Sequence, residues 1–86
     1  MMANADATRL KRLKMRSWRR GTKEMDMILG PFADTALAGL DVRSLDQYET
    51  LLSENDQDLY VWVTRQVTTP VEFASILDKV RDFHGI

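Results

Sequence analysis

One long apolar stripe constrains the fold of this chain more than any other feature. Residues 25–40 place apolar side chains at i, i+3, i+4, i+7 and onward, namely Met25, Ile28, Leu29, Phe32, Ala33, Ala36, Leu37 and Leu40. This spacing puts them on one face of a helix about 25 Å long. Gly30-Pro31 lies inside the stripe, where proline removes a backbone hydrogen bond and clashes with the preceding turn. Because the apolar phase continues across Pro31, we expect one kinked helix rather than two separate helices.

The segment before this stripe predicts a helix with a narrower apolar face. We expect the helix over about residues 5–19, with Asn4 or Asp6 as its N-cap. Gly21 then marks its end or the corner into the next helix. Its apolar positions are Leu10, Leu13, Met15 and Trp18. Since these are few, most of the helix is expected to expose cationic side chains.

Three shorter helices are expected after residue 40, each with its own start signal. The signals are a capping box from Ser44 to Gln47, the polar run 55–58, and Thr69 as N-cap with Pro70 and Glu72 in the first turn. Leu59 and Trp62 are expected in the core, and no five-residue window alternates as a half-buried strand would. The sequence therefore predicts an all-α, compact five-helix bundle. It forms a single domain over residues 1–86, with residues 1–4 frayed and the free protein monomeric.

The two parts of the chain differ sharply in charge. Residues 1–23 carry eight basic side chains and one acidic side chain, whereas the remainder carries four basic and twelve acidic side chains. A basic segment of this kind can bind nucleic acid, anionic lipid or an acidic protein surface. It can equally pair with the acidic remainder of the same chain. The charge pattern leaves these readings open.

Composition excludes most catalytic and metal chemistry. The chain has no cysteine and a single histidine, so thiol chemistry and a His-His metal pair are excluded. His84 is expected on the surface near a helix C-terminus. No glycine-rich phosphate loop occurs, and no apolar run approaches the roughly 20 residues that span a bilayer. We therefore expect a protein that is not an enzyme, with no catalytic, metal or cofactor site and no membrane-spanning segment.

The most notable polar constellation is the corner between the first two helices, residues 19–26. Two arginines there precede Gly21 and the free N–H groups of a helix start, an arrangement that attracts carboxylates or phosphates. Gly21 lacks a Cβ, so the backbone of another protein can approach closely. Glu24 can offer an acceptor beside the arginine donors. The alternative is a surface Arg20–Glu24 pair at i,i+4 spacing with Gly21 as a corner residue.

The corner resembles a known family signature. Arg20-Gly21-x-x-Glu24, followed by Met25-Asp26 and the apolar run 28–32, is similar to the R-G-x-x-E signature of the succinate dehydrogenase assembly factor 2 family, also called FAD assembly factor SdhE. Asp56-x-Asp58-Leu59-Tyr60-x-Trp62 resembles that family's second signature, D-x-D-L-x-x-W. The similarity covers about residues 9–83. The two signatures together, at this separation in a short helical chain, make it specific.

The resemblance implies an assembly factor that binds the flavoprotein subunit of succinate dehydrogenase, and that of fumarate reductase. It would promote covalent attachment of FAD to a histidine of that subunit, while the FAD itself belongs to the client and no cofactor is stably bound here. The implied partner-binding residues are Arg20, Gly21 and Glu24. We add their neighbours Arg16, Arg19 and Asp26. Asp58 is expected near a helix cap.

A different class of function is the alternative. The basic residues between Arg9 and Arg20 suggest a small nucleic-acid-binding or antitoxin-like regulatory protein. No helix-turn-helix pattern accompanies them, and Trp18 is the only stacking aromatic nearby, so nucleic acid is not the partner we expect. The expected location is the cytoplasm for a bacterial source and the mitochondrial matrix for a eukaryotic one.

Overall fold

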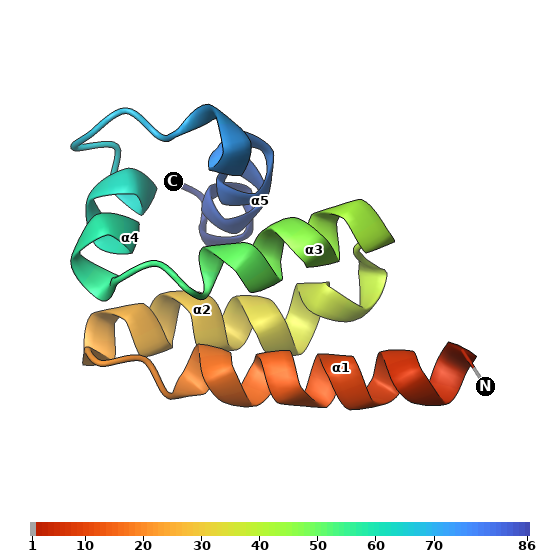
Figure 1. Cartoon of the computed structure of the whole chain (residues 1–86). Helices are drawn as coiled ribbons and strands as arrows, with labels where there is room; N and C mark the ends of the chain where they lie inside the picture. Colours follow the sequence, from red (N-terminus) through yellow and green to blue (C-terminus); the bar gives the residue numbers. More distant parts are fainter. Residues whose placement is uncertain (1) are drawn as a thin grey trace.

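The described part of the chain folds into five α-helices and two short 3-10 helices. A computed structural model describes the backbone of residues 2–86 and the side chains of residues 7–86. In chain order the elements are α1 (Met2–Trp18), α2 (Lys23–Ala36), η1 (Leu37–Gly39), α3 (Val42–Leu51), α4 (Asp56–Val63), η2 (Val71–Phe73) and α5 (Ala74–His84) (Figure 1). No strand occurs in this part of the chain. The predicted all-α bundle of five helices is confirmed.

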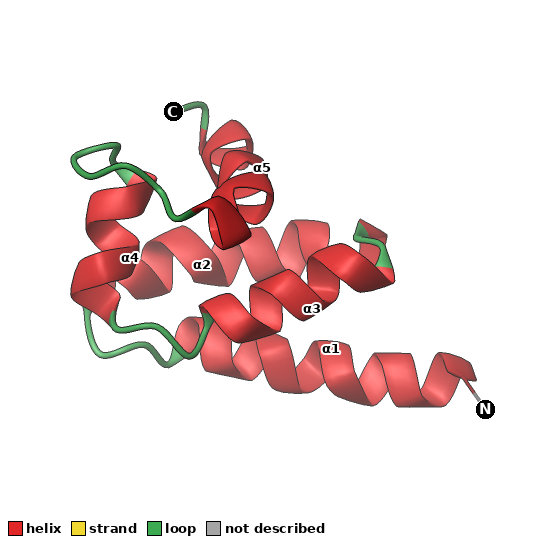
Figure 2. Ribbon diagram, turned by 45° about the horizontal axis from the view of Figure 1, so that its top comes forward, coloured by secondary structure: helices red, strands yellow, loops and turns green. Residues whose placement is uncertain are grey.

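Helices α1 and α2 lie side by side and antiparallel, and the rest of the bundle is built on α2. Figure 1 shows α3 returning along the pair, with α4 and α5 on the side of α2 away from α1. Contacts from α2 reach α1, α4 and α5, which makes α2 the centre of the packing. The connections are short except for the segment between α4 and α5 (Figure 2).

The core follows the long apolar stripe. Met25, Leu29, Phe32, Ala33 and Leu37 are each at most 1% exposed, as the helical spacing predicts. The other helices close over them with a set of apolar side chains that includes Leu13, Tyr48, Leu51, Leu59, Trp62, Phe73, Ile76, Leu77 and Val80. The predicted core positions of Leu59 and Trp62 are confirmed.

Helix α2 runs through Pro31 as one element, as expected from the unbroken stripe. Pro31 has no N–H to give to the preceding turn. His84, in the last turn of α5, lies against this turn, and its Nε2 is 2.6 Å from the carbonyl oxygen of Ile28. A carbonyl only accepts, so this Nε2 carries the proton. His84 is thus half-buried and tied to α2, not an open surface residue as the sequence suggested.

The predicted starts of α1, α3 and α5 differ from those observed, whereas the start of α4 agrees. Asp41, not Ser44, caps α3, because its Oδ1 accepts the Ser44 N–H at 2.9 Å and Ser44 is itself buried. Helix α1 already begins at Met2, so Asn4 and Asp6 have helical backbone, and their side chains lie outside the described residues. Asn55 does cap α4 as predicted, with Oδ1 accepting the Asp58 N–H at 2.8 Å.

The start of the last helix was also predicted wrongly. Pro70 has extended ψ of 143°, and a 3-10 turn at Val71–Phe73 precedes α5. The Thr69 hydroxyl does not cap this helix but accepts from Nη2 of Arg81 at 2.5 Å. Arg81 is only 4% exposed and also donates to the Trp62 carbonyl at 3.0 Å. The buried guanidinium therefore takes the hydroxyl that would have capped the helix. Gly85 ends α5 in the left-handed region, with φ of 73°, as expected.

Helices α1 and α2 approach closely at Gly30. A Cβ added there would lie 2.4–2.6 Å from atoms of the Trp18 indole ring. That ring is held in place because its Nε1 donates to Oδ2 of Asp34 at 3.1 Å. No such crowding exists at Gly39, where a Cβ would meet nothing within 4 Å.

This contrast gives a test of the helix pairing. Gly30→Ala should destabilise the protein by about 1–3 kcal/mol, because the added methyl group must displace the Trp18 ring. The measurement is chemical unfolding followed by tryptophan fluorescence, to which Trp18 and Trp62 both contribute. Gly39→Ala is the matched control and should be neutral or slightly stabilising. Equal stability of the two variants would contradict the close packing described here.

Candidate functional site

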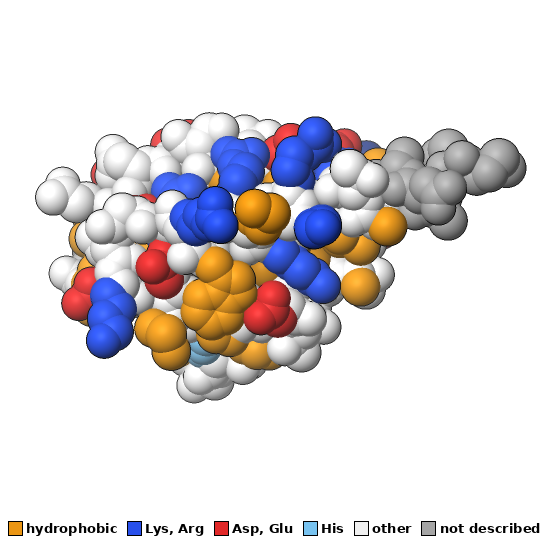
Figure 3. Space-filling model, turned by 90° about the horizontal axis from the view of Figure 1, so that it is seen from below, with side chains coloured by type: hydrophobic (Ala, Val, Ile, Leu, Met, Phe, Trp, Pro, Cys, Tyr) orange, Lys and Arg blue, Asp and Glu red, His pale blue; other side chains and the backbone are white. Residues whose placement is uncertain are grey.

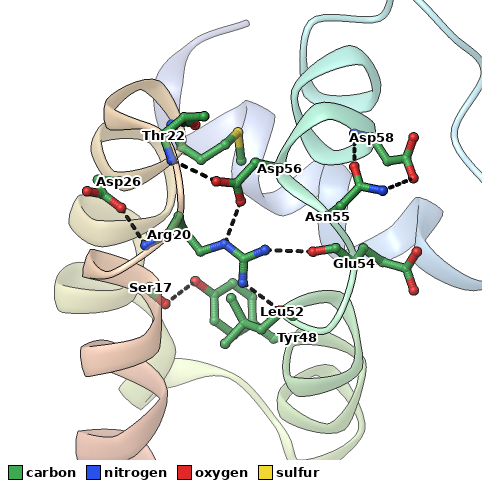
Figure 4. Close-up of polar contacts among 11 residues, drawn as sticks. Ser17, Arg20, Thr22, Asp26, Tyr48, Leu52, Glu54, Asn55, Asp56 and Asp58 are labelled. Carbon is green, nitrogen blue, oxygen red and sulfur yellow. Dashed lines mark hydrogen bonds and ion pairs between the residues drawn. The ribbon is translucent and has the colours of Figure 1, made fainter.

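The predicted corner lies between the end of α1 and the start of α2, facing the turn from α3 into α4. Figure 4 shows Arg20 and Thr22 from the corner beside Leu52, Glu54 and Asp56 from that turn. Thr22 caps α2, with its hydroxyl oxygen accepting the Met25 N–H at 3.3 Å. Segments more than thirty residues apart in the sequence thus meet at this point.

Arg20 is the centre of these contacts. Its Nε donates to Oδ1 of Asp56 at 2.8 Å, and its terminal nitrogens donate to the carbonyl oxygens of Leu52 at 2.5 Å and Glu54 at 2.6 Å. The carbonyls at and after a helix C-terminus have no partner within the helix. Arg20 therefore joins the end of α3 to the start of α4, and its side chain is only 12% exposed.

Asp56 completes the clamp from the other side. Its Oδ2 accepts the N–H of Thr22 at 2.8 Å, at the start of α2. Burial opposes ionisation of this carboxyl, but the Arg20 hydrogen bond and charge, together with the Thr22 and Gly21 backbone, keep its pKa below the ordinary value of 3.8. The anion that the corner was expected to attract is thus supplied by the chain itself. We call Arg20 and Asp56 the corner clamp.

The proposed Arg20–Glu24 surface pair is wrong. The Arg20 guanidinium points to Asp56 and the α3–α4 turn, and each of its three nitrogens already donates a hydrogen bond there. A pair at i,i+4 also requires both residues to lie in one helix. Arg20 precedes the Thr22 cap, so it is outside α2, whereas Glu24 is inside.

The absence of a side chain at Gly21 leaves space for the Asp56 carboxylate of the corner clamp. A Cβ at this position would lie 3.1 Å from Oδ2 of Asp56, which is closer than side chains ordinarily pack. The close approach that the glycine was expected to allow is therefore made by a carboxylate of the same chain. The exposed side of Gly21 borders a shallow hollow with Thr22, Asn55 and Gln57.

Asp26 supports the corner, and Glu24 does not. Oδ1 of Asp26 accepts the backbone N–H of Arg20 at 2.6 Å, and the residue is half-buried. Glu24 is exposed, and no hydrogen bond or ion pair joins its carboxylate to the side chains of residues 7–86. It borders an open hollow of about 550 Å³ whose apolar side is formed by Tyr60 and Val61. Glu24 thus presents an exposed carboxylate that no side chain among residues 7–86 pairs with.

Arg16 and Arg19 lie on the outer side of the same corner. Arg19 is exposed and Arg16 half-buried. Together with Arg12, Met15 and Arg20 they line a second hollow of about 310 Å³. The structure therefore brings all six predicted site residues to one end of the α1–α2 pair, although in different roles. Arg20, Gly21 and Asp26 shape the corner, while Glu24, Arg16 and Arg19 face outward.

A buried hydroxyl pair beneath the clamp escaped the sequence analysis. The oxygens of Ser17 and Tyr48 are 2.6 Å apart, and both residues are completely buried (Figure 4). Burial raises the pKa of the Tyr48 phenol to about 12, although the Ser17 hydrogen bond and the nearby Arg20 charge act against this rise. The pair joins α1 to α3 and supports the corner from below. Leu10, Leu13 and Ser17 at i, i+3 and i+7 carry the signal that could have found it.

The two aspartates of the second signature also have different structural roles. Asp56 belongs to the clamp, whereas Oδ2 of Asp58 accepts from Nδ2 of Asn55 at 3.0 Å beside the α4 cap, as predicted. No cluster of His, Cys, Asp or Glu that could hold a metal ion occurs among the described residues. None of the helices described is long and apolar enough to cross a bilayer.

Comparison with known proteins places this arrangement in context. The model of a family described as the flavinator of succinate dehydrogenase matches residues 11–84. Succinate dehydrogenase assembly factor 2, mitochondrial, from Candida glabrata is 40% identical over 77 residues, covering 84% of this chain and 50% of that protein. Proteins of the same name from Aspergillus terreus and Mycosarcoma maydis are 41% and 35% identical, over 71% and 84% of this chain and 22% and 30% of their own length. The chain thus spans half or less of these relatives.

The clamp makes a specific prediction about pH. Asp56→Asn should cost about 1.5–3 kcal/mol at about pH 7, because the Arg20 charge loses its ionised partner. The folded-state pKa of Asp56 is lowered, so its contribution is complete above the ordinary value of 3.8 and is lost as the pH falls through the folded-state value. The stability difference between wild type and variant should therefore shrink at about pH 3.

The measurement is urea unfolding of both proteins at the two pH values. Asp82→Asn is the control, because Asp82 is exposed on α5 and its side chain has no partner among the residues described. This change should leave stability within about 0.5 kcal/mol of wild type. A difference for Asp56→Asn that stays constant between the two pH values would contradict the ionised clamp.

Proposed function

The chain belongs to the family described as the flavinator of succinate dehydrogenase, and from that membership we propose that it is an assembly factor. It binds the flavoprotein subunit of succinate dehydrogenase and promotes covalent attachment of FAD to that subunit. The observation that carries the proposal is the corner itself. Both family signatures meet there, with Arg20 of one bonded to Asp56 of the other.

The corner has the physical properties of a rigid docking surface. Arg20 is held by three different groups, so the backbone around Gly21 cannot shift without straining these part-buried hydrogen bonds. Glu24 presents an unpaired carboxylate beside an apolar hollow. An acceptor carried on a rigid helix beside an apolar surface favours a donor or a cationic side chain of the partner.

A protein of this kind acts by orientation rather than by chemistry of its own. The flavin and the histidine that accepts it belong to the client, and the flavin supplies the reactive ring. By binding the client, the corner would hold the client's domains in the arrangement where these two groups meet, which lowers the barrier through positioning. We therefore propose a non-catalytic assembly factor that needs no bound cofactor.

The corner is a poor site for FAD itself. The N-terminus of α2 is where a helix would bind the pyrophosphate of a dinucleotide. The Asp56 carboxylate already lies against the Thr22 N–H there, so a phosphate group would meet a negative charge. This supports the proposal that FAD belongs to the client alone.

Three finer statements belong to the same proposal. The flavoprotein subunit of fumarate reductase is a second client, and the free protein is a monomer. The relatives are named as mitochondrial proteins. We accordingly propose the mitochondrial matrix for a eukaryotic source and the cytoplasm for a bacterial one.

Glu24 provides the sharpest test. Glu24→Ala should weaken binding of the purified flavoprotein subunit by about fivefold or more, because the partner loses an oriented acceptor. It should slow covalent flavin attachment, read as protein-bound flavin fluorescence in a denaturing gel. A purely electrostatic basic surface predicts the opposite, since removing an acid strengthens attraction to any anionic partner. Affinity should be measured at two salt concentrations to separate the two.

Glu72→Ala is the matched control. Glu72 is also an exposed acid in the first turn of a helical element, but it lies in η2, away from the corner. It should bind like wild type, and both variants should melt near the wild-type midpoint. Binding by Glu24→Ala that equals or exceeds wild type would remove Glu24 from the client surface.

A further inference from the structure

The basic segment is largely unpaired within the fold. Of the eight basic residues in residues 1–23, Arg9 pairs with Asp46 and Glu49, and Arg20 pairs with Asp56. The other six form no ion pair with the side chains of residues 7–86. They are Lys11, Arg12, Lys14, Arg16, Arg19 and Lys23. The acidic remainder of the chain therefore does not neutralise this surface, and most of its charge is available to a partner.

All of these cations except Lys23 line hollows beside an exposed apolar ridge on α1. Met15 is 43% exposed and Trp18 is 39% exposed, although both lie among charged neighbours. Lys11, Lys14 and Arg19 join them around a hollow of about 480 Å³. Figure 3 shows this face, with blue cationic side chains gathered along α1 and orange apolar groups between them. We call Met15 and Trp18 the α1 ridge.

We propose that the α1 ridge and its flanking cations Lys11, Lys14 and Arg19 are a second docking surface for the client flavoprotein. It fits an acidic segment of that protein that also carries an apolar side chain. The apolar group would lie against Met15 and Trp18, and the acidic groups would pair with the cations on either side. The inference rests on the proposed function and extends it from the corner to the length of α1.

The fixed position of Trp18 favours a protein over a lipid or a nucleic acid. One part of the indole ring packs on the α2 backbone at Gly30, and its N–H is bonded to Asp34. A ring held in this way can neither insert into a bilayer nor slide between bases. The Asp34 carboxylate beside it would also repel a continuous row of phosphates, whereas it tolerates separated acidic side chains.

The ridge is continuous with the corner. Met15 lies between the two hollows on α1, and the second hollow is shared with Arg16, Arg19 and Arg20 of the corner. One rigid helix thus connects both surfaces. Two contacts on one rigid body fix the orientation of a client better than one contact does, and the second forms at high effective concentration. The cations would also speed the first encounter at low salt.

The experiment measures binding of the purified flavoprotein subunit by four variants of this chain. Met15→Ser removes the apolar ridge, and the double change Lys11→Gln and Lys14→Gln removes two cations. The controls are Val42→Ser and Lys79→Gln, which alter an exposed apolar residue and an exposed cation on α3 and α5. Each ridge variant should bind about fivefold more weakly, with melting midpoints unchanged. The double variant should also show a weaker dependence on salt, and the controls should bind like wild type.

The outcomes separate this inference from the proposed function. If Glu24→Ala weakens binding while the ridge variants bind like wild type, the corner is the whole client surface and the ridge proposal is overturned. If the wild type itself does not bind the flavoprotein subunit, the proposed function fails. The proposal that this subunit binds the α1 ridge then fails with it. Binding to phosphatidylserine vesicles or to a short duplex DNA that the ridge variants abolish would overturn the proposal in favour of that ligand.

Discussion

The ion pair between Arg20 and Asp56 is the interaction on which the rest of the arrangement depends. Together with the backbone contacts of both residues, it joins three helix ends, namely the end of α3, the start of α4 and the start of α2. A domain of this size buries a small core, so its helices are held together by few apolar layers. Hydrogen-bond partners for the backbone groups at helix ends therefore contribute a larger share of the stability than in a larger protein. Both residues of the pair are nearly buried, where a charge without its partner would be costly.

The acidic and basic side chains of the chain have different roles in the fold. Acidic residues are used inside the fold: Asp56 holds Arg20, Asp26 holds the Arg20 backbone, and Asp34 holds the Trp18 ring. Most cations of α1 have no such use among the residues described. The basic surface is therefore a feature of the folded protein and not only of its sequence. Charges that folding leaves unpaired remain available to a partner and steer its approach.

The sequence predicts interactions between residues that are close together in the chain, but not the partners of residues that are far apart. The stripe on α2 and the Asn55 cap are local patterns, and the structure confirms both. Thr69 was also judged locally, but a buried guanidinium twelve residues later takes its hydroxyl. The partner of Arg20 lies 36 residues away, and a single sequence offers several acids at comparable distance. Helical spacing could have identified Ser17 as buried, since it continues the face of Leu10 and Leu13.

Residues of the first signature have different roles in the corner, and this changes how their variants should be interpreted. A replacement of Arg20 leaves Oδ1 of Asp56 and two carbonyl groups without partners, and a side chain at Gly21 presses on the same carboxylate. A loss of function in such a variant reports on the shape of the corner and does not by itself show contact with a partner. Glu24 has no role in the described fold that its removal would disturb. Of the three residues that define the signature, only the glutamate can be replaced to test recognition of a partner without breaking a contact of the corner.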